Sequence, residues 1–225
     1  MSVTAPDAAA TTAMPGVWDL RGRPGAVPAE LWFDAGDLVV VSGLPGSGKS
    51  TLIRRTVRTA TGVMDATATA GTAATGAHGA HRLDSQDVRE RFARRVHPSL
   101  PYALYRPLVR LAHYARLLRA LRSGRGLVVH DCGNRRWVRA LLACAARRRG
   151  GALHLLLLDV APDAALAGQH ARGRRVSRHA FGAHRRAFAR LLERVAATGP
   201  PPGCASVLLF DRTAADTVRT LGFRR

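Results

Sequence analysis

Short apolar runs alternate along the chain with longer stretches in which apolar residues recur every three or four positions. Such a pattern is typical of strands that alternate with helices. Four runs rich in valine and leucine predict strands at 37–42, 126–131, 152–159 and 206–211, and a brief run predicts another strand at 80–84. Helical spacing predicts helices at 50–58, 86–96, 102–122 and 135–149, from 164, at 177–197 and at 214–221. The pattern therefore predicts an α/β fold, with a parallel sheet, helices on both faces and a ligand at the carboxyl ends of the strands.

The segments outside this alternation indicate how the chain is organised. Residues 1–16 are small and polar without periodicity, which is typical of a disordered tail. From 17 to 36, isolated bulky residues stand between prolines and glycines, which predicts an irregular flap or short edge strand packed on the core. Residues 60–80 form an Ala/Thr/Gly tract with little to fill a core, which predicts a mobile loop. We therefore expect one domain over 37–225.

One glycine-rich segment carries the strongest chemical signal. Residues 43–50 read GLPGSGKS and match the phosphate-binding pattern G-x-x-x-x-G-K-[ST], between a predicted strand and a predicted helix. The backbone N–H groups of such a loop, together with the helix N-terminus, bind the phosphates of a nucleotide. The candidate nucleotide-binding residues are Gly43, Leu44, Pro45, Gly46, Ser47, Gly48, Lys49, Ser50 and Thr51. Among them, Ser50 is the candidate Mg²⁺ ligand.

Lys49 is the only lysine in a chain with 35 lysine and arginine residues. A compact ammonium on a thin stem can reach between the β- and γ-phosphates of a nucleotide, whereas a planar guanidinium is too wide for that space. The chain uses arginine at every other one of these positions, so it has kept lysine where the shape of the cation matters. This observation favours bound ATP or GTP.

The net charge of +20 has two explanations. Abundant alanine, arginine and glycine with almost no lysine, isoleucine or asparagine is typical of a GC-biased coding sequence. The imbalance of 35 bases against 15 acids instead favours a polyanionic partner such as RNA or DNA. Three cysteines without C-x-x-C spacing predict neither a disulfide framework nor a zinc site. Because no apolar run approaches about 18 residues and no signal-peptide pattern is present, we expect a cytoplasmic protein that does not enter a membrane.

Four aspartates stand at the ends of predicted strands, where a parallel sheet presents its ligand: Asp84, Asp131, Asp159 and Asp211. Asp131 ends the run Leu-Val-Val-His-Asp, the usual form of the second nucleotide motif, whose carboxylate holds Mg²⁺ near the γ-phosphate. It could instead cap the following helix. Asn134, the only asparagine, is either a helix cap or a substrate contact.

Three residues at the end of the second predicted strand or just beyond it are candidates for the acceptor side of a transfer reaction. Asp87 is the candidate base that takes the proton of an attacking hydroxyl, and Asp84 is the reserve for that role. Arg89 could hold the acceptor or its phosphate in place. Alternatively, Asp87 only stabilises the start of a surface helix through the helix dipole.

Two arginine-rich segments could also contact ligands. The segment 168–177 is a candidate lid, in which Arg172 and Arg174 would close over the phosphates and neutralise charge in the transition state, unless they are solvated surface residues. The helix predicted at 102–122 interleaves tyrosines with arginines, which could stack on a nucleic-acid end and neutralise it. Alternatively, its apolar residues belong to the core and its arginines are solvated.

Four motifs follow one another along the chain: GLPGSGKST at 43–51, QDVR at 86–89, HDCGN at 130–134 and the arginine-bearing lid. Together they resemble the P-loop kinase branch of the nucleoside-triphosphate-binding proteins, within the group of AAA-type ATPases that includes polynucleotide 5′-hydroxyl kinases and zeta-toxin-like kinases. The resemblance implies a three-layer sandwich, a five-stranded sheet in the order 2-3-1-4-5, ATP or GTP with Mg²⁺ as donor, and a hydroxyl acceptor. Two departures concern catalysis. Gln86 stands where some relatives carry an acidic residue, and an extra residue separates Asp131 from Asn134.

These observations favour an enzyme that moves the γ-phosphate of ATP or GTP to a hydroxyl of a small molecule or of a nucleic-acid 5′ end. Two alternatives stay open. The chain could be a nucleotide-dependent switch that transfers no phosphate, or a basic nucleic-acid-binding ATPase.

Overall fold

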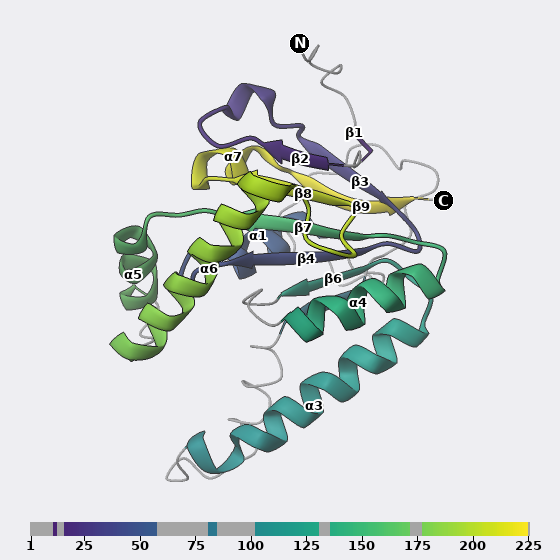
Figure 1. Cartoon of the computed structure of the whole chain (residues 1–225), viewed down its shortest axis with the longest axis horizontal. Helices are drawn as coiled ribbons and strands as arrows, with labels where there is room; N and C mark the ends of the chain where they lie inside the picture. The colour runs from purple at the N-terminus through teal and green to yellow at the C-terminus, as the bar shows by residue number, and fades with distance from the viewer. Residues whose placement is uncertain are drawn as a thin grey trace.

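The centre of the protein is a six-stranded sheet in which every neighbouring pair of strands is parallel (Figure 1). The computed structural model describes residues 11–12, 16–57, 81–84, 102–130, 136–171 and 177–224. The strands of this sheet are β2 (Gly16–Asp19), β4 (Leu38–Gly43), β5 (His81–Asp84), β6 (Leu127–His130), β7 (Leu153–Leu158) and β8 (Ser206–Phe210). Their order is β2-β8-β7-β4-β6-β5. With β4 to β8 as strands one to five, the order 2-3-1-4-5 is confirmed, and β2 adds a sixth strand beside β8.

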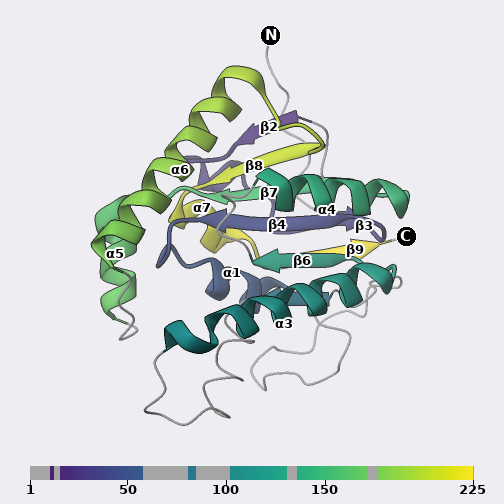
Figure 2. The ribbon, with the colours of Figure 1, turned by 60° about the horizontal axis from the view of Figure 1, so that its bottom comes forward.

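Helices connect the strands and cover both faces of the sheet (Figure 2). They are α1 (Lys49–Thr56), α3 (Tyr102–Arg122), α4 (Arg136–Arg148), α5 (Pro162–His170), α6 (Arg178–Thr198) and α7 (Arg212–Thr217), with a short 3-10 turn, η1 (Pro24–Ala26). The helix predicted at 102–122 coincides with α3. The helix predicted from 177 is α6, and Ser177 caps it, because its Oγ accepts a hydrogen bond from the N–H of Ala180 at 3.2 Å. The helix predicted at 86–96 lies outside the described residues.

The residues of the central strands alternate between two hydrophobic cores. In β4, Val39 and Val41 face one core, which is completed by α1, α7 and a second, smaller sheet. Leu38 and Val40 face the other core, which is completed by α3, α4 and α6. All four side chains are fully buried. The unbroken apolar run therefore reflects a parallel strand that is covered on both sides.

The smaller sheet pairs the beginning of the chain with its end. It consists of β1 (Thr11–Thr12), β3 (Glu30–Asp34) and β9 (Thr220–Arg224), in the order β1-β3-β9. Buried Phe33 of β3 and buried Phe223 of β9 pack together, with ring centroids 5.9 Å apart.

Three predictions for the ends of the chain need correction. The helix predicted at 214–221 ends at Thr217 and is followed by strand β9. The segment 17–36, expected to be an irregular flap or a short edge strand, contributes β2 to the edge of the central sheet and β3 to the smaller sheet, so only the flap is corrected. The tail predicted to be disordered over 1–16 contains strand β1. The local pattern over 17–36 indicated an edge strand but could not show which strands would pair, because each of these strands pairs with a segment far away in the sequence or depends on one that does.

The apolar residues of α3 also differ from the expectation that they belong to the core. Val109 and Leu117 are buried, with Leu117 packed in the core on the α4 side of the sheet. Four other leucines, which the helical spacing placed on the apolar face, are exposed: Leu104, Leu108, Leu111 and Leu118. The spacing identified the helix but not the side that faces the sheet.

A buried polar cluster lies at the amino ends of the central strands. The carboxylate of Asp37 accepts hydrogen bonds from the backbone N–H groups of Asp34 and Ala152, both at 2.7 Å, and lies 3.2 Å from Nε2 of His154. Nδ1 of His154 lies 2.8 Å from Oγ of Ser206. Burial alone would raise the pKa of Asp37, but the contact with His154 and the two backbone donors hold it below its ordinary value. Although serine, histidine and aspartate follow one another here, Ser206 is fully buried and no substrate can reach it.

Candidate nucleotide-binding site

The phosphate loop (residues 43–51) leads from β4 into α1, as the sequence predicts. Gly46 and Gly48 have φ angles of +89° and +104°, which residues with side chains rarely adopt. Gly48 is the N-cap of α1, and this helix end has neither a side-chain cap nor an acidic residue in its first turn. No carboxylate of its own first turn therefore competes for the N–H groups at the start of α1, and the positive end of the helix dipole favours an external anion.

Lys49 lies inside the curve of this loop. Its side chain is 4% exposed, and its Nζ donates hydrogen bonds to the carbonyl oxygens of Gly43 at 2.9 Å and Leu44 at 2.6 Å, with Oγ of Ser47 at 3.4 Å. A buried ammonium needs such acceptors to offset the loss of hydration. Ser50, the candidate metal ligand, is buried one residue further along α1. The loop therefore holds a positive charge and a hydroxyl side by side, where phosphates and a hard cation would be bound.

Helix α5 packs closely against the tip of the phosphate loop. A Cβ atom added to Gly46 would collide with the carbonyl oxygen of Ala165, and one added to Gly168 would lie 2.6 Å from the carbonyl oxygen of Gly46. Nε2 of Gln169 donates a hydrogen bond to the carbonyl oxygen of Pro45 at 2.9 Å, and Gln169 is buried. Residue patterns alone did not single out Gln169. The small residues Ala165 and Gly168, three positions apart, were the only available signal of close packing.

An open cavity of about 270 Å³ lies beside the loop, at the end of the sheet toward which the strands point. Helices α1, α5 and α7 come together around this end (Figure 2). The cavity is lined by Ser47, Gly48, Thr51, Leu52, Arg55, Leu158, Gly168, Ala171, Arg212, Ala215 and Asp216. Its size is close to the lower limit for small-molecule sites, which is about 300 Å³. It begins at the phosphate loop, so it can hold the nucleoside of a bound nucleotide.

Two arginines line the cavity in different ways. Arg55 joins α1 to α7, with hydrogen bonds to the carboxylate of Asp216 at 2.9 Å and to the carbonyl oxygen of Ala215 at 2.7 Å. Its ion pair with Asp216 is exposed and contributes little stability. The exposed guanidinium of Arg212 has no hydrogen-bond or ion-pair partner in the described part of the chain, so it is available to a ligand. Sequence reasoning missed Arg212, which follows the strand-end residue Asp211.

Two of the four strand-end aspartates accept hydrogen bonds from other parts of the protein and stabilise the fold. Arg21 donates a hydrogen bond to Asp159 at 2.6 Å and also pairs with Asp19. Asp211 accepts hydrogen bonds from the N–H of Gly22 at 2.6 Å and from the N–H of Ala214 at 2.7 Å, which caps α7. These backbone donors lower the pKa of Asp211. The segment after β2 thereby occupies both carboxylates.

Several predicted site residues lie outside the described residues: Asp87, Arg89, Asp131, Asn134, Arg172 and Arg174. Asp84 ends β5 opposite His130 of β6, so it stands at the predicted edge of the sheet but two strands away from β4. β6 itself pairs directly with β4 and ends one residue before Asp131. No group of three or more potential metal ligands occurs among the described histidines, cysteines and acidic residues. Within the same residues, none of the helices has the length and apolarity needed to cross a membrane.

Comparison with known families identifies the domain. Residues 38–198, well over half of the chain, match the family model of the AAA domain. The chain belongs to the AAA domain family. Membership agrees with the phosphate loop and the strand order, and it places the chain among P-loop nucleotide-binding proteins of the ATP-dependent kinase or ATPase class. The matched region excludes β2, β3, β8 and β9, which pair across the two ends of the chain.

Among solved structures, one match with a TM-score above 0.5 supports this fold at low sequence identity. A Chloroflexus aurantiacus protein inferred to be a kinase is 16% identical with a TM-score of 0.51, and the alignment covers 82% of this chain and 90% of that one. A tunicamycin resistance protein from Deinococcus radiodurans is 14% identical over 74% of this chain and 99% of that one, with a TM-score of 0.37. A sugar kinase from Janibacter sp. HTCC2649 is 17% identical over 77% and 84%, with a TM-score of 0.33. No curated protein matches the chain.

Proposed function

We propose that this AAA domain protein is a phosphotransferase that moves the γ-phosphate of ATP or GTP, bound with Mg²⁺, to a hydroxyl group. The observation that carries the proposal is the phosphate loop with buried Lys49 and an adjoining cavity of about 270 Å³. The donor set fits the nucleotide, since an ammonium, a helix N-terminus without acidic residues and a hydroxyl suit phosphates and Mg²⁺.

Each described residue of the site would have a distinct role toward the nucleotide. Lys49 would exchange its backbone acceptors for phosphate oxygens, and Ser50 would hold the metal through its hydroxyl. Arg212 would contact the nucleoside from the wall of the cavity. Gln169 would fix the position of the phosphate loop through the carbonyl oxygen of Pro45. The nucleotide supplies an activated phosphoryl group with a good leaving group.

The acceptor side of the proposal rests on the sequence. Asp87 would take the proton of the acceptor hydroxyl as a bond forms between its oxygen and the γ-phosphorus, while the bond from that phosphorus to the β-phosphate oxygen breaks. Asp131 would support the metal that Ser50 holds. Asp84, Arg89 and Asn134 would position the acceptor, and Arg172 and Arg174 would neutralise the charge that develops during transfer.

A labelling experiment tests transfer directly. The purified protein is incubated with γ-labelled ATP or GTP, Mg²⁺ and separate pools of nucleosides, sugars, antibiotics and 5′-hydroxyl oligonucleotides. We expect labelled acceptor in one pool, loss of labelling on chelation of the metal, and loss in Lys49→Ala. The matched control is Arg54→Ala, which removes an exposed cation of the same helix that does not line the cavity.

The products separate this proposal from the alternatives. If label is released only as free phosphate in every pool, the chain is an ATPase and the transfer proposal is wrong. If nucleotide binds but the label stays on it, the chain is a nucleotide-dependent switch. If neither nucleotide binds at millimolar concentration, both the enzyme and the switch are excluded.

A further inference from the structure

Helix α3 presents a stripe of leucines to solvent. Leu104, Leu108, Leu111 and Leu118 are 65%, 56%, 67% and 45% exposed. Exposed Ala115 completes the series, in which consecutive members are alternately four and three residues apart. We call these five residues the leucine seam. Contiguous apolar surface of this kind is rare on a monomer and marks interaction sites.

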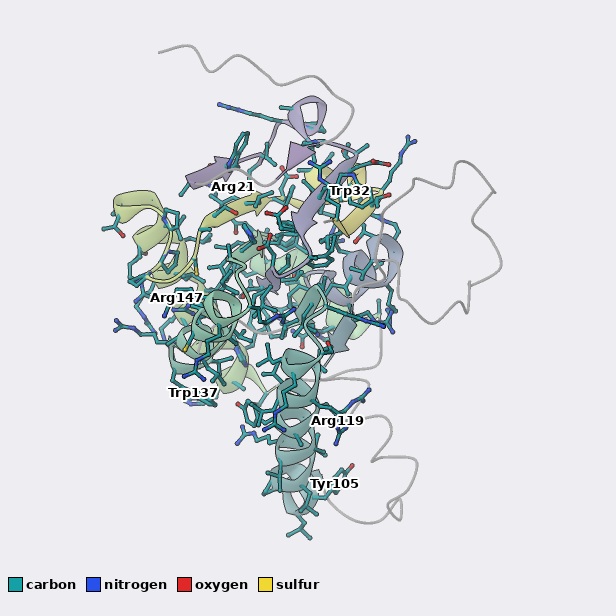
Figure 3. The ribbon with its side chains drawn as sticks, turned by 90° about the vertical axis from the view of Figure 1, so that its right-hand side faces the viewer. Arg21, Trp32, Tyr105, Arg119, Trp137 and Arg147 are labelled. Atoms are coloured by element: carbon teal, nitrogen blue, oxygen red, sulfur yellow. The ribbon has the colours of Figure 1, made fainter. Side chains whose placement is uncertain are left out.

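The seam is not needed to hold α3 on the protein. Val109, at 5% exposure, and Leu117, at 1%, lie on another side of the helix, and Leu117 packs with Leu83 of β5 and Val129 of β6 in the core. The end of α3 that carries Tyr105 projects away from the sheet (Figure 3). Exposure of these leucines to water is therefore unfavourable, and the leucines do not contribute to the packing of the described fold.

The spacing of the seam fits one kind of occupant in particular. Alternating steps of four and three residues are those of a coiled-coil helix, whose apolar positions insert between the side chains of a facing helix. From Leu104 to Leu118 the seam is about 21 Å long at 1.5 Å per residue, which is enough for four turns of a partner helix. A helix is therefore a better match than an extended peptide, whose side chains alternate with a period of two.

The apolar surface continues from α3 onto α4. Tyr114, which stands three residues after Leu111, packs against Trp137 with ring centroids 5.5 Å apart. Trp137 is 52% exposed and Leu141, one turn further along α4, is 37% exposed. Figure 3 shows Trp137 beside α3. An exposed tryptophan at the edge of an apolar surface is a typical anchor of a protein interface.

The charges on α3 and α4 indicate what kind of helix would bind to the seam. Neither α3 nor α4 contains a single aspartate or glutamate. Exposed arginines flank the seam and the neighbouring face of α4: Arg110, Arg119, Arg122, Arg136, Arg147 and Arg148. Pairing of two copies through this face would set arginines against arginines, which opposes self-association.

We propose that the leucine seam, together with Trp137, is a docking site for an acidic amphipathic helix of another protein. Apolar residues of that helix would cover the leucines, and its flanking carboxylates would pair with the arginines of α3 and α4. This surface is separate from the cavity beside the phosphate loop, so the proposal does not depend on the nucleotide chemistry.

A designed peptide pair provides the test. One peptide, of about three heptads, carries leucine at the core positions and glutamate at the flanking positions. Its twin carries lysine in place of glutamate. Binding to the full-length chain is measured by fluorescence anisotropy of the labelled peptides and by the fluorescence of Trp137, compared with a Trp137→Phe variant. We expect micromolar binding of the acidic peptide and none of the basic twin.

Two double variants separate the seam from general charge attraction. Leu108→Glu with Leu111→Glu introduces carboxylates into the seam, and we expect it to weaken binding about tenfold or more. Ala183→Glu with Ala189→Glu adds the same charge at exposed positions of α6, and we expect it to bind like the parent. Nucleotide binding by all variants verifies that they are folded.

Five results would overturn the proposal. In the first, the acidic peptide binds no form of the chain, and in the second it binds both double variants equally. Sedimentation shows a dimer of the parent that the seam variant dissociates, which would make a second copy the occupant. Vesicles of anionic lipid bind the parent and not the seam variant, which would make a membrane the occupant. A Leu111→Cys variant reacts with maleimide no faster than the parent, which would mean that the chain itself covers the seam.

Discussion

Replacement of Gly46 by alanine tests whether α5 really supports the phosphate loop. The change forces a side chain into a backbone with φ +89°, which costs about 1–2 kcal/mol. The new Cβ also collides with the carbonyl oxygen of Ala165, a backbone atom that cannot rotate away, and overpacking costs about 1–3 kcal/mol more. The matched control is Gly150→Ala, where φ is +69° and nothing lies within 4 Å of the added atom. The control therefore carries only the first cost.

Thermal unfolding measures how much stability each variant loses, and nucleotide titration measures how much affinity it loses. For a chain of this length, about 1 kcal/mol corresponds to about 2–4 °C in Tm. We expect Gly150→Ala to lower Tm modestly and to bind nucleotide like the parent. Gly46→Ala should either lower Tm clearly further or release the strain by moving the loop away from α5, with about a tenfold or greater loss of nucleotide affinity. Equal Tm and equal affinity in the two variants would refute the close contact between α5 and the loop.

Three further predictions concern single side chains. Lys49→Arg keeps the charge but should lose nucleotide affinity as completely as Lys49→Ala in calorimetric titration, and parent-like binding would contradict the argument from cation shape. Gln169→Leu leaves the buried carbonyl oxygen of Pro45 without its donor, so we expect a loss of about 1–3 kcal/mol in unfolding free energy and weaker nucleotide binding, whereas unchanged affinity would limit Gln169 to a structural role. The lowered pKa of Asp37 contributes stability that is complete above its unfolded value of about 3.9 and is lost as the pH falls from there toward the folded value. Asp37→Asn places an amide N–H against a backbone N–H, so urea unfolding should show a loss of about 1–3 kcal/mol at pH 7. As the pH falls below about 4, the unfolding free energy of the same variant should decline less than that of the parent. An equal decline in the two proteins would show that other groups control the loss of stability in acid.

The central sheet was predictable because its strands can be recognised from their local sequence. β4 and β7 are buried on both faces, so their sequences are unbroken apolar runs that cannot be confused with loops. The glycine pattern then fixes which strand precedes the phosphate loop, and the resemblance to P-loop kinases supplies the strand order. Ser177 and the periodic residues behind it likewise predict the start of α6.

The elements that were not predicted depend on partners distant in sequence. Val218, just before β9, and Leu221, within it, continue the apolar spacing of α7, and only the pairing with β3 makes β9 a strand. The contacts of Arg21 with Asp159 and of Gly22 with Asp211 join residues 138 and 189 positions apart. A sequence pattern cannot show that these carboxylates are already engaged.

The phosphate loop of the candidate site was predicted from the sequence, but the residues that α5 and α7 place against it were not. The phosphate loop is contiguous in sequence, so its residues and the role of Lys49 follow from one motif. Gln169 and Arg212 come from α5 and α7, which reach the loop only through the fold. Neither residue type is distinctive by itself, least of all an arginine in so arginine-rich a chain.

The pairing of β2 with β8 and of β3 with β9 has a consequence for biosynthesis. β2 and β3 leave the ribosome well before β8 and β9, because the other strands and helices of the domain lie between them in the sequence. The outer edge of the sheet and the layer around Phe33 therefore cannot close until β8 and β9 have emerged. Contacts of such long sequence separation slow folding and leave apolar strand edges open in the meantime. A nascent chain that stops before β8 should consequently be a substrate for chaperones.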